Sequence, residues 1–480
     1  MATIERSLER DPLATVSTAC RPAPTCGSGG RTTSGPTHLS ILGGGLAGLA
    51  LGYHARRAGL GFTIYEAADR LGGNCVTLDH QGFRFDSGAH RFHDRDPAVT
   101  AMVKELLGEA LEQTDAPSQL YYDGQLIDFP LAPLNLMKSL GWRCLGKVGL
   151  EVLYARLCQQ RRGRDFEGFA LYTYGKTIAQ RFLLNYSQKL WGIPCCELSP
   201  EAAVKRLKGL DLRTFLAEAI LGRKTRTRHL DGAFLYPRAG IGTIAEKLAE
   251  HCGPDSIHVN STITKVLHDH ARIRAVEING KDRIDVQDVV STQPLPHLLK
   301  MMEPPPPEEV LALARSLQFR DLILVALFLD RPRVTETATV YFPETAFPFT
   351  RVYEPCNRSA QMSPPGQTSL VAEISCDEED SPRPGAVQEK WVETVRSRLI
   401  QIGWIRPREI LDSAMVRMKC AYPVLSVDTP DTVRKLQSFL HRFTNLKVTG
   451  RNGRLLHASI HDILAMGEQV VCELTSVPRQ

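Results

Sequence analysis

The sequence predicts an α/β fold in which a parallel-sheet domain, assembled from discontinuous segments, is interrupted by a helical insertion and a mixed-sheet segment. Three observations predict it. A short apolar run enters a glycine-rich turn and a helix near residue 39, helical patterns rich in Leu, Lys and Arg fill residues 131–228, and alternating strand patterns return from residue 257. The 480 residues allow two or three cores of about 150 residues each.

The composition narrows the class of protein. Hydrophobic residues make up 43% and charged residues 23%, which is typical of a globular protein and excludes a disordered chain, a collagen-like fibre and a small disulfide scaffold. The net charge of +5 is too small to indicate a nucleic-acid partner. No apolar stretch reaches the length of a membrane-spanning helix. The 12 cysteines form no CxxC pair, so we expect a reducing, cytoplasmic location.

Residues 1–37 are expected to form a disordered tail, because they are rich in Gly, Pro, Ser and Thr and lack the apolar core of a secretory signal. The first ordered unit follows at once. Leu39–Leu42 reads as a buried strand, Leu46–Ala58 as a helix stopped by Gly59, and Phe62–Glu66 as a second strand. This is a strand, turn, helix and strand unit of about 30 residues.

The turn carries a GxGxxG motif formed by Gly43, Gly45 and Gly48, with Glu66 after the second strand. The first glycine permits a tight turn, the second lets the backbone approach a pyrophosphate, and the third lets the helix pack closely. The helix N-terminus offers N–H groups to phosphates, and Glu66 accepts hydrogen bonds from a ribose. The residues expected at this dinucleotide are Gly43, Gly45, Leu46, Ala47, Gly48, Glu66 and Ala67.

Further motifs indicate which dinucleotide binds. Arg70–Asn74 (RLGGN) and Phe83–His90 follow the acid, and Gly450–Gly453 with the helix after it closes the chain. In this order they resemble the amine oxidase and protoporphyrinogen oxidase-like flavoproteins over residues 38–473. The resemblance implies a Rossmann-like FAD-binding domain of the GR2 type, with Val266 against the adenine. The additional FAD contacts that it implies are Arg70, Gly72, Gly73, Asn74, Gly88, Ala89, His90, Val266, Gly450, Arg451, Asp462 and Ile463.

Within this clan the chain is most similar to the UDP-galactopyranose mutase-like proteins. The segments that carry this likeness are Gly88–His93, Tyr121–Pro130, Lys189–Gly192, Thr350–Glu354 and Ala421–Pro423. Two segments depart from the pattern. Lys205–Leu210 has a leucine where the mutases place a second arginine against the UDP pyrophosphate, and Tyr236–Gly242 looks closer to the protoporphyrinogen oxidase-like relatives.

The resemblance also indicates residues at the reacting end of the flavin. We expect His90 to contact the flavin, aromatic side chains to line a substrate cavity, and arginines to bind phosphate or carboxylate. The candidate catalytic and substrate residues are His90, Arg91, Tyr186, Trp191, Arg206, Tyr236, Arg238, Arg351, Tyr353 and Tyr422.

Two other kinds of site are not expected. Gly240, Gly242 and Ala245 form a GxGxxA string, but no acid follows at the spacing that a nicotinamide dinucleotide requires. His90 and His93 lack a third ligand nearby, so no metal site is expected.

The predicted domains follow from these segments. Residues 38–115, 240–300 and 440–476 are expected to form the FAD-binding domain, residues 116–239 a helical substrate domain, and residues 301–439 a sheet-rich substrate domain. Three functions remain open. The first is an FAD-dependent oxidoreductase that takes a hydride from a small sugar-like or other polar metabolite and passes electrons to oxygen or another external acceptor. The second is a redox-neutral sugar mutase that uses reduced flavin as a nucleophile. The third is a non-catalytic binding protein of the escort type. The oligomeric state is not predicted.

Overall fold

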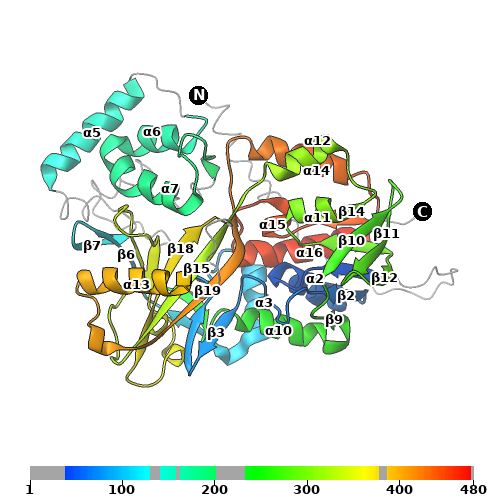
Figure 1. Ribbon diagram of the computed structural model, residues 1–480, viewed down its shortest axis with the longest axis horizontal. Helices are drawn as coiled ribbons and strands as arrows, with labels where there is room; N and C mark the ends of the chain where they lie inside the picture. Colours follow the sequence, from blue (N-terminus) through cyan, green and yellow to red (C-terminus); the bar gives the residue numbers. More distant parts are fainter. Residues whose placement is uncertain (1–37, 130–140, 158–162, 202–232, 378–385, 477–480) are drawn as a thin grey trace. The chain divides into compact units, whose positions relative to one another are not determined.

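The computed structural model describes residues 38–129, 141–157, 163–201, 233–377 and 386–476 (Figure 1). The predicted tail at 1–37 and the basic stretch at 205–210, which includes Arg206, lie outside these residues. None of the helices in the described ranges is long and apolar enough to cross a membrane.

A parallel five-stranded sheet forms the first layer. Its strand order is β20-β13-β1-β2-β9, and every neighbouring pair is parallel. The strands are β1 (His38–Leu42), β2 (Gly61–Tyr65), β9 (Ile257–His258), β13 (Asp288–Ser291) and β20 (Leu446–Val448). They come from three distant stretches of the chain, and the predicted α/β fold class is confirmed.

Helices and a small mixed sheet enclose this sheet. Apolar side chains alternate along its strands, so that Ile41 and Val290 belong to the core shared with the helices, whereas Val289 belongs to the core shared with the mixed sheet. The helices are α2 (Leu46–Arg57), α3 (Pro97–Leu107), α10 (Thr243–Cys252) and α16 (Ile460–Ser476). The second sheet contains β10 (Ile263–His268), β11 (Ile273–Ile278), β12 (Asp282–Asp285) and β14 (Met302–Glu303). The helix α11 (Leu295–Met301) precedes β14 in sequence, and α12 (Glu308–Arg315) follows it.

A seven-stranded sheet forms the centre of the substrate side (Figure 1). Its order is β19-β15-β18-β17-β16-β6-β7. The strands are β6 (Ser118–Tyr122), β7 (Gln125–Phe129), β15 (Phe319–Leu329), β16 (Thr339–Tyr341), β17 (Arg351–Tyr353), β18 (Thr368–Cys376) and β19 (Ile410–Pro423). The hairpin β6–β7 falls within 116–239 in sequence, but it joins this sheet because β6 pairs in parallel with β16.

The apolar run of β15 is buried on both faces of the sheet. Val325 and Leu327 pack with Val395 of α13 (Ala386–Gln401), while Leu324 belongs to the opposite core. A strand that is buried on both faces does not alternate between apolar and polar residues, and this explains why the apolar residues of β15 follow one another without interruption.

The remaining elements connect these layers. The helical segment contains α5 (Trp142–Leu157), α6 (Phe166–Ile178), a π-helical stretch (Ala179–Leu184) and α7 (Asn185–Trp191). The strands β3 (Thr77–His80) and β4 (Phe83–Asp86) form a hairpin. The strands β5 (Leu111–Thr114) and β8 (Phe234–Pro237), which are distant in sequence, form a second antiparallel pair. The helices α14 (Thr429–Leu440) and α15 (Arg451–Arg454) flank β20 in sequence, and short 3₁₀ turns occur at Gly108–Ala110, Pro254–Ser256, Pro355–Asn357, Ala360–Met362 and Pro407–Glu409.

Candidate functional site

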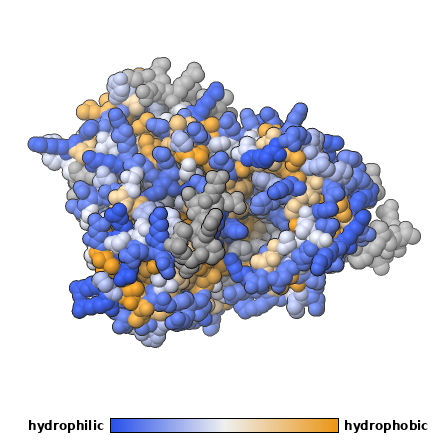
Figure 2. All heavy atoms as spheres, in the orientation of Figure 1, coloured by the Kyte–Doolittle hydropathy of each residue, from blue (hydrophilic) through white to orange (hydrophobic). Residues whose placement is uncertain are grey.

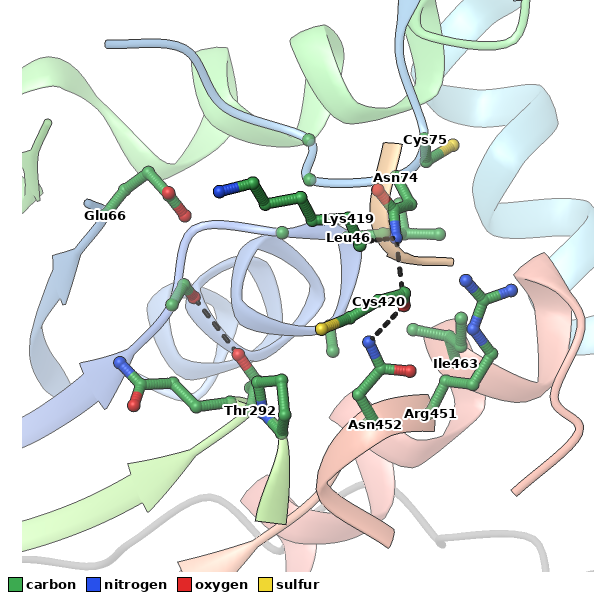
Figure 3. A pocket seen from close by; sticks show the side chains of 18 of the residues that line it. Leu46, Glu66, Asn74, Cys75, Thr292, Lys419, Cys420, Arg451, Asn452 and Ile463 are labelled. Atoms are coloured by element: carbon green, nitrogen blue, oxygen red, sulfur yellow. Dashed lines mark hydrogen bonds between the residues drawn. The ribbon is translucent and has the colours of Figure 1, made fainter. Parts of the chain in front are cut away.

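A cavity of about 610 Å³ lies where the parallel sheet meets the long strand β19. Its walls come from eight segments of the chain: the β1–α2 turn, the end of β2, the loop before β3, His90 after β4, the start of β10, the β13–α11 loop with α11, the end of β19, and the chain from Gly450 into α16 (Figure 3). Ligands of open parallel sheets bind at the carboxyl ends of the strands, and this cavity has that position.

The glycine turn is shaped by close backbone contacts. Gly43 has a φ of +112°, and a Cβ there would lie 2.5 Å from Thr292 Oγ1. A Cβ on Gly48 would lie 1.9 Å from the Gly43 carbonyl oxygen, so the helix packs against the turn only with glycine at this position. Gly45 differs, because the nearest atom to its Cβ position is Gly73 Cα at 3.8 Å and the residue lines the cavity. A side chain at Gly45 would therefore occupy the cavity and not the protein core.

The N-terminus of α2 faces the same cavity. Gly45 is the N-cap and offers no side-chain acceptor to the first N–H groups of the helix, and the first turn has no acidic residue. Leu46 and Ala47 line the cavity. The positive end of a helix together with free N–H groups is a suitable site for a pyrophosphate.

Glu66 is held at the cavity by two backbone amides. Its Oε2 accepts a hydrogen bond from Gly44 N at 2.7 Å, and its Oε1 accepts from Ala68 N at 2.9 Å. Each carboxylate oxygen keeps a further lone pair for a ribose hydroxyl. Glu66 and Ala67 both line the cavity, and Figure 3 shows the carboxylate at its edge.

The loop after β2 lies against the glycine turn. Gly72 N donates to the Gly44 carbonyl at 2.9 Å, and Gly72, Gly73 and Asn74 line the cavity. Arg70 does not line it, since its guanidinium donates to the Gly73 carbonyl at 3.2 Å. Arg70 therefore supports the loop from outside the cavity.

A bulge at Lys419–Ala421 brings the substrate-side sheet into the cavity. Arg320 pairs with Tyr422 and Leu322 with Met418, so three residues of β19 oppose Asp321 alone. Asp321 Oδ1 accepts from Cys420 N at 2.7 Å, and the Cys420 carbonyl accepts from Asn452 Nδ2 at 2.8 Å (Figure 3). Sequence reasoning did not find the bulge, because β19 mixes exposed and buried residues and no local pattern marks the register shift.

The C-terminal segment closes the cavity beside α2. A Cβ on Gly450 would lie 3.0 Å from Ala47 Cβ, so the two ends of the chain meet closely there. Gly450, Arg451 and Ile463 line the cavity. Asp462 does not, because its carboxylate accepts from Ser459 N and Oγ at the start of α16.

The contact that the resemblance implies between Val266 and the adenine stays a prediction. Val266 is fully buried within β10 and does not line the cavity, whereas Thr262 and Ile263 do. Val266 pairs with Val276 and Met302 on its two sides, which fixes its side chain in the core.

His90 lines the cavity and adjoins the substrate-side sheet. Burial, together with the nearby guanidinium groups of Arg351, Arg451 and Arg358, lowers the pKa of His90 to about 3. The imidazole is therefore neutral near pH 7. Gly88 and Ala89 do not line the cavity, and the His90 ring lies close to Gly88, since a Cβ there would be 3.4 Å from His90 Nε2.

Three substrate-side candidates meet near this loop. The Arg351 guanidinium donates to the Tyr422 hydroxyl at 3.1 Å, and the rings of Tyr422 and Trp191 pack edge to face with centroids 6.0 Å apart. Trp191 is 1% exposed, so it also serves as core. The Tyr186 ring packs edge to face against the Tyr341 ring, with centroids 5.9 Å apart, and both tyrosines raise the pKa of Arg351.

Arg91 lies beyond His90 and is enclosed. Its guanidinium donates to Ser118 Oγ at 2.7 Å and lies 4.9 Å from the Phe234 ring centroid. Burial lowers the pKa of Arg91 to about 10. Among the described residues, the hydrogen-bond partner of Arg91 is thus a hydroxyl and not a carboxylate. The other N–H groups of its guanidinium can donate to an anionic substrate.

Of the ten candidate catalytic and substrate residues, His90 is the one described residue that lines the cavity, and Tyr236, Tyr353 and Arg238 are held elsewhere by other partners. Tyr236 and Tyr353 are 0% and 1% exposed, and both hydroxyls donate to Asp86, one to its carboxylate and one to its carbonyl. Arg238 pairs with Glu112 at an exposed position, and Arg206 is outside the described residues. Tyr236 and Tyr353 act on the site only by fixing the strand β4 that leads to His90.

Lys189 has a structural contact that its motif did not reveal. Its ammonium donates to three backbone carbonyls, those of Phe342, Glu344 and Phe347, at 2.6 to 2.9 Å. Burial lowers the pKa of Lys189 to about 7. The side chain ties α7 to the loop after β16 and so fixes the helical segment on the sheet.

Comparison with known proteins gives three findings. A model of the family described as flavin containing amine oxidoreductase matches residues 46–429. Protoporphyrinogen oxidase 1, chloroplastic, of Arabidopsis thaliana is 28% identical over 202 residues, which cover 39% of this chain and 37% of that protein. Coproporphyrinogen III oxidase of Bacillus subtilis (strain 168) is 30% identical over 295 residues, which cover 55% of this chain and 61% of that protein. The matches thus span less than two thirds of either curated relative.

A solved structure supports the fold over nearly the whole chain. The crystal structure of reduced UDP-galactopyranose mutase superposes with a TM-score of 0.79 and 19% identity, covering 93% of this chain and 96% of that one. At this identity the likeness concerns the fold.

Proposed function

The chain belongs to the family of flavin-containing amine oxidoreductases, and from this we propose that it is an FAD-dependent oxidoreductase that oxidises a polar, anionic metabolite beside His90. The predicted family resemblance and the predicted cofactor, FAD, are confirmed by the family match. The residues of the cavity fit that cofactor, because Glu66 suits a ribose, the N-terminus of α2 suits a pyrophosphate, and Gly45 leaves the space between them empty.

The observation that carries the proposal is that one cavity is lined both by predicted dinucleotide-binding residues and by His90. Glu66 and His90 line the same cavity, so Glu66 and the glycine turn would hold a dinucleotide in the cavity that His90 shares, and His90 is near Arg351. When bound, FAD supplies the two-electron step by taking a hydride from a substrate C–H bond and passing the electrons to oxygen or another external acceptor. The protein itself supplies binding, orientation and charge.

In this proposal His90 helps to orient the bound molecules through a hydrogen bond and does not transfer a proton. A group with a pKa of about 3 is a poor base near pH 7, so its neutral ring acts as a hydrogen-bonding contact. Arg351 stays charged, because the paired Glu373 carboxylate outweighs the effect of burial and raises the pKa of Arg351 well above its usual range, and its guanidinium also donates to the Tyr422 hydroxyl. With Arg91 close to the same loop, the region favours a substrate that carries a carboxylate or phosphate.

The proposal is tested by mixing the oxidised protein anaerobically with candidate metabolites and following the flavin absorbance. Bleaching by an anionic metabolite, and recovery after oxygen is admitted, is the expected result. Trp191→Ala is expected to retain flavin and lose most of the bleaching rate, because Trp191 packs against Tyr422. Trp142→Ala is the matched control, since Trp142 is 73% exposed. Full bleaching in Trp191→Ala would remove Trp191 from the site.

A redox-neutral sugar mutase is the second candidate. The likeness in fold to reduced UDP-galactopyranose mutase favours it, together with the contacts of Lys189 and Trp191 in the KLWG segment. The same experiment separates the two functions. Turnover that requires prior chemical reduction of the flavin, with no net oxidation of the sugar, supports the mutase and contradicts the oxidoreductase.

A further inference from the structure

Helix α5 has one apolar face that is packed and a second that is exposed. The packed face consists of Val148, Val152 and Ala155, which are 8%, 4% and 7% exposed and lie against α6. A surface helix of a globular protein ordinarily has a single apolar face. The second face of α5 therefore requires an explanation of its own.

The exposed face carries large apolar side chains. Among the described residues, nine large hydrophobic side chains are exposed, and five of them are on α5. They are Trp142, Leu150, Leu153, Tyr154 and Leu157, with exposures of 73%, 69%, 53%, 66% and 71%. Their spacing places them on one side of a helix with 3.6 residues per turn, opposite the packed face. Figure 2 shows apolar side chains gathered over the region of α5 at the upper left.

The charges of α5 are distributed unevenly around this face. Arg143, Lys147 and Arg156 are exposed. By helical position Lys147 and Arg156 fall at the two edges of the apolar stripe, and Arg143 lies within it, between Leu150 and Tyr154. The one acid of the helix, Glu151, is turned away from solvent, because its two oxygens accept hydrogen bonds from Thr177 N and Oγ1, and Lys147 Nζ lies 3.9 Å from it. The exposed side of α5 thus combines an apolar stripe with one cation within it and two at its edges.

This combination complements one kind of partner. An anionic membrane surface offers an apolar interior below a layer of phosphates, so the stripe enters the acyl boundary while the long cationic side chains reach the headgroups. A second copy of the chain matches less well, because it would bring the same cations together at the rim of the interface. With 16 residues, α5 is too short to span a bilayer but long enough to lie in its surface.

We propose that α5 docks the protein peripherally on a membrane that contains anionic lipid, with Leu150, Leu153 and Leu157 inserted and Arg143, Lys147 and Arg156 at the phosphates. The docking is independent of the reaction proposed above, because α5 contributes no residue to the cavity. It places the helical segment at the lipid, and the flavin domain remains in water.

The test is sedimentation of the flavin-loaded full chain with vesicles. Vesicles of phosphatidylcholine with phosphatidylglycerol are compared with vesicles of phosphatidylcholine alone. We expect binding to the anionic vesicles that weakens as salt is added, and at least about 10-fold weaker binding to the neutral ones. Leu150→Ser with Leu153→Ser is expected to lower the affinity for anionic vesicles by about 10-fold or more. The pair Arg143→Glu with Lys147→Glu is expected to remove the preference for anionic lipid.

The controls keep the result interpretable. Both leucines are exposed, so the variant is expected to keep the flavin spectrum and melting temperature of the wild type. Leu411→Ser makes the same change at a residue of β19 that is 50% exposed, and it is expected to leave vesicle binding unchanged. Equal sedimentation of the wild type and the α5 variants, or no sedimentation of either, would overturn the proposal. So would a dimer in solution that dissociates in Leu150→Ser with Leu153→Ser without any vesicle binding, because the face would then be an interface between copies.

Discussion

Arg351 and Glu373 form an enclosed ion pair in which Arg351 Nε donates to Glu373 Oε2 at 2.6 Å, with side-chain exposures of 13% and 1%. The second carboxylate oxygen of Glu373 accepts from Ala89 N at 2.6 Å. One carboxylate thus joins strand β17 to the backbone that precedes His90. The position of His90 relative to the substrate-side sheet depends on this residue.

Glu373→Gln tests that relationship. The change leaves the Arg351 guanidinium enclosed without its counter-charge, and breaking a buried pair in this way costs about 3–5 kcal/mol. We expect a loss of that size in the free energy of unfolding, measured by denaturant titration, with flavin still bound. Glu308→Gln is the control, because its pair with Arg315 is exposed, and such pairs contribute about 1 kcal/mol or less. Equal losses in the two variants would contradict the buried role of Glu373.

Gly45→Val tests the FAD site. The Cβ position of Gly45 has no atom of the described residues closer than 3.8 Å and lies on the cavity wall, so the valine fills the cavity and not the core. The variant is expected to fold with a melting temperature close to that of the wild-type apoprotein and to bind little or no flavin. Gly146→Val makes the same substitution on α5, where no atom lies within 4 Å, and is expected to retain its flavin. A wild-type flavin load in Gly45→Val would remove the pyrophosphate from this turn.

Lys419 is expected to strengthen FAD binding through its charge. It lies on the β19 bulge, lines the cavity, and in Figure 3 extends across it toward the side where Glu66 lies. No residue of the GxGxxG turn itself carries a positive side chain, so Lys419 is suited to the pyrophosphate charge. We expect Lys419→Ala to raise the Kd for FAD by about 10-fold and to weaken the salt dependence of binding.

The readout for Lys419→Ala is the quenching of flavin fluorescence during titration of the apoprotein. Lys435→Ala, at an exposed position of α14, is the charge-matched control and is expected to keep the wild-type Kd. An unchanged Kd in Lys419→Ala would show that the lysine only shields the mouth of the cavity.

The parts of the site that sequence could predict are the local ones. Gly43, Gly45 and Gly48 lie within six residues of one another, and their roles follow from the close contacts of a single turn. The Lys419–Ala421 bulge arises from the register between β15 and β19, which are distant in sequence, so no local pattern marks it. Tyr236 was predicted at the substrate from its motif, but whether a tyrosine meets a ligand or Asp86 depends on tertiary packing. Fold class and cofactor were therefore predictable, whereas the substrate-side contacts were not.

His90 gives a pH dependence whose sign can be worked out. Its pKa is about 3 in the folded protein and 6.5 when unperturbed, so between these values the unfolded chain binds the extra proton. The free energy of unfolding therefore falls as the pH decreases through this window, and for His90 alone the loss between about pH 8 and pH 5 is roughly 1–2 kcal/mol. His90→Gln lacks this loss. Denaturant titrations at the two pH values are expected to show a smaller pH effect in His90→Gln than in the wild type, and the wild-type effect in His441→Gln, which alters an exposed histidine. The same pH dependence in His90→Gln and the wild type would mean that folding does not lower the pKa of His90, and the neutral, enclosed contact assigned to it beside the flavin would then be wrong.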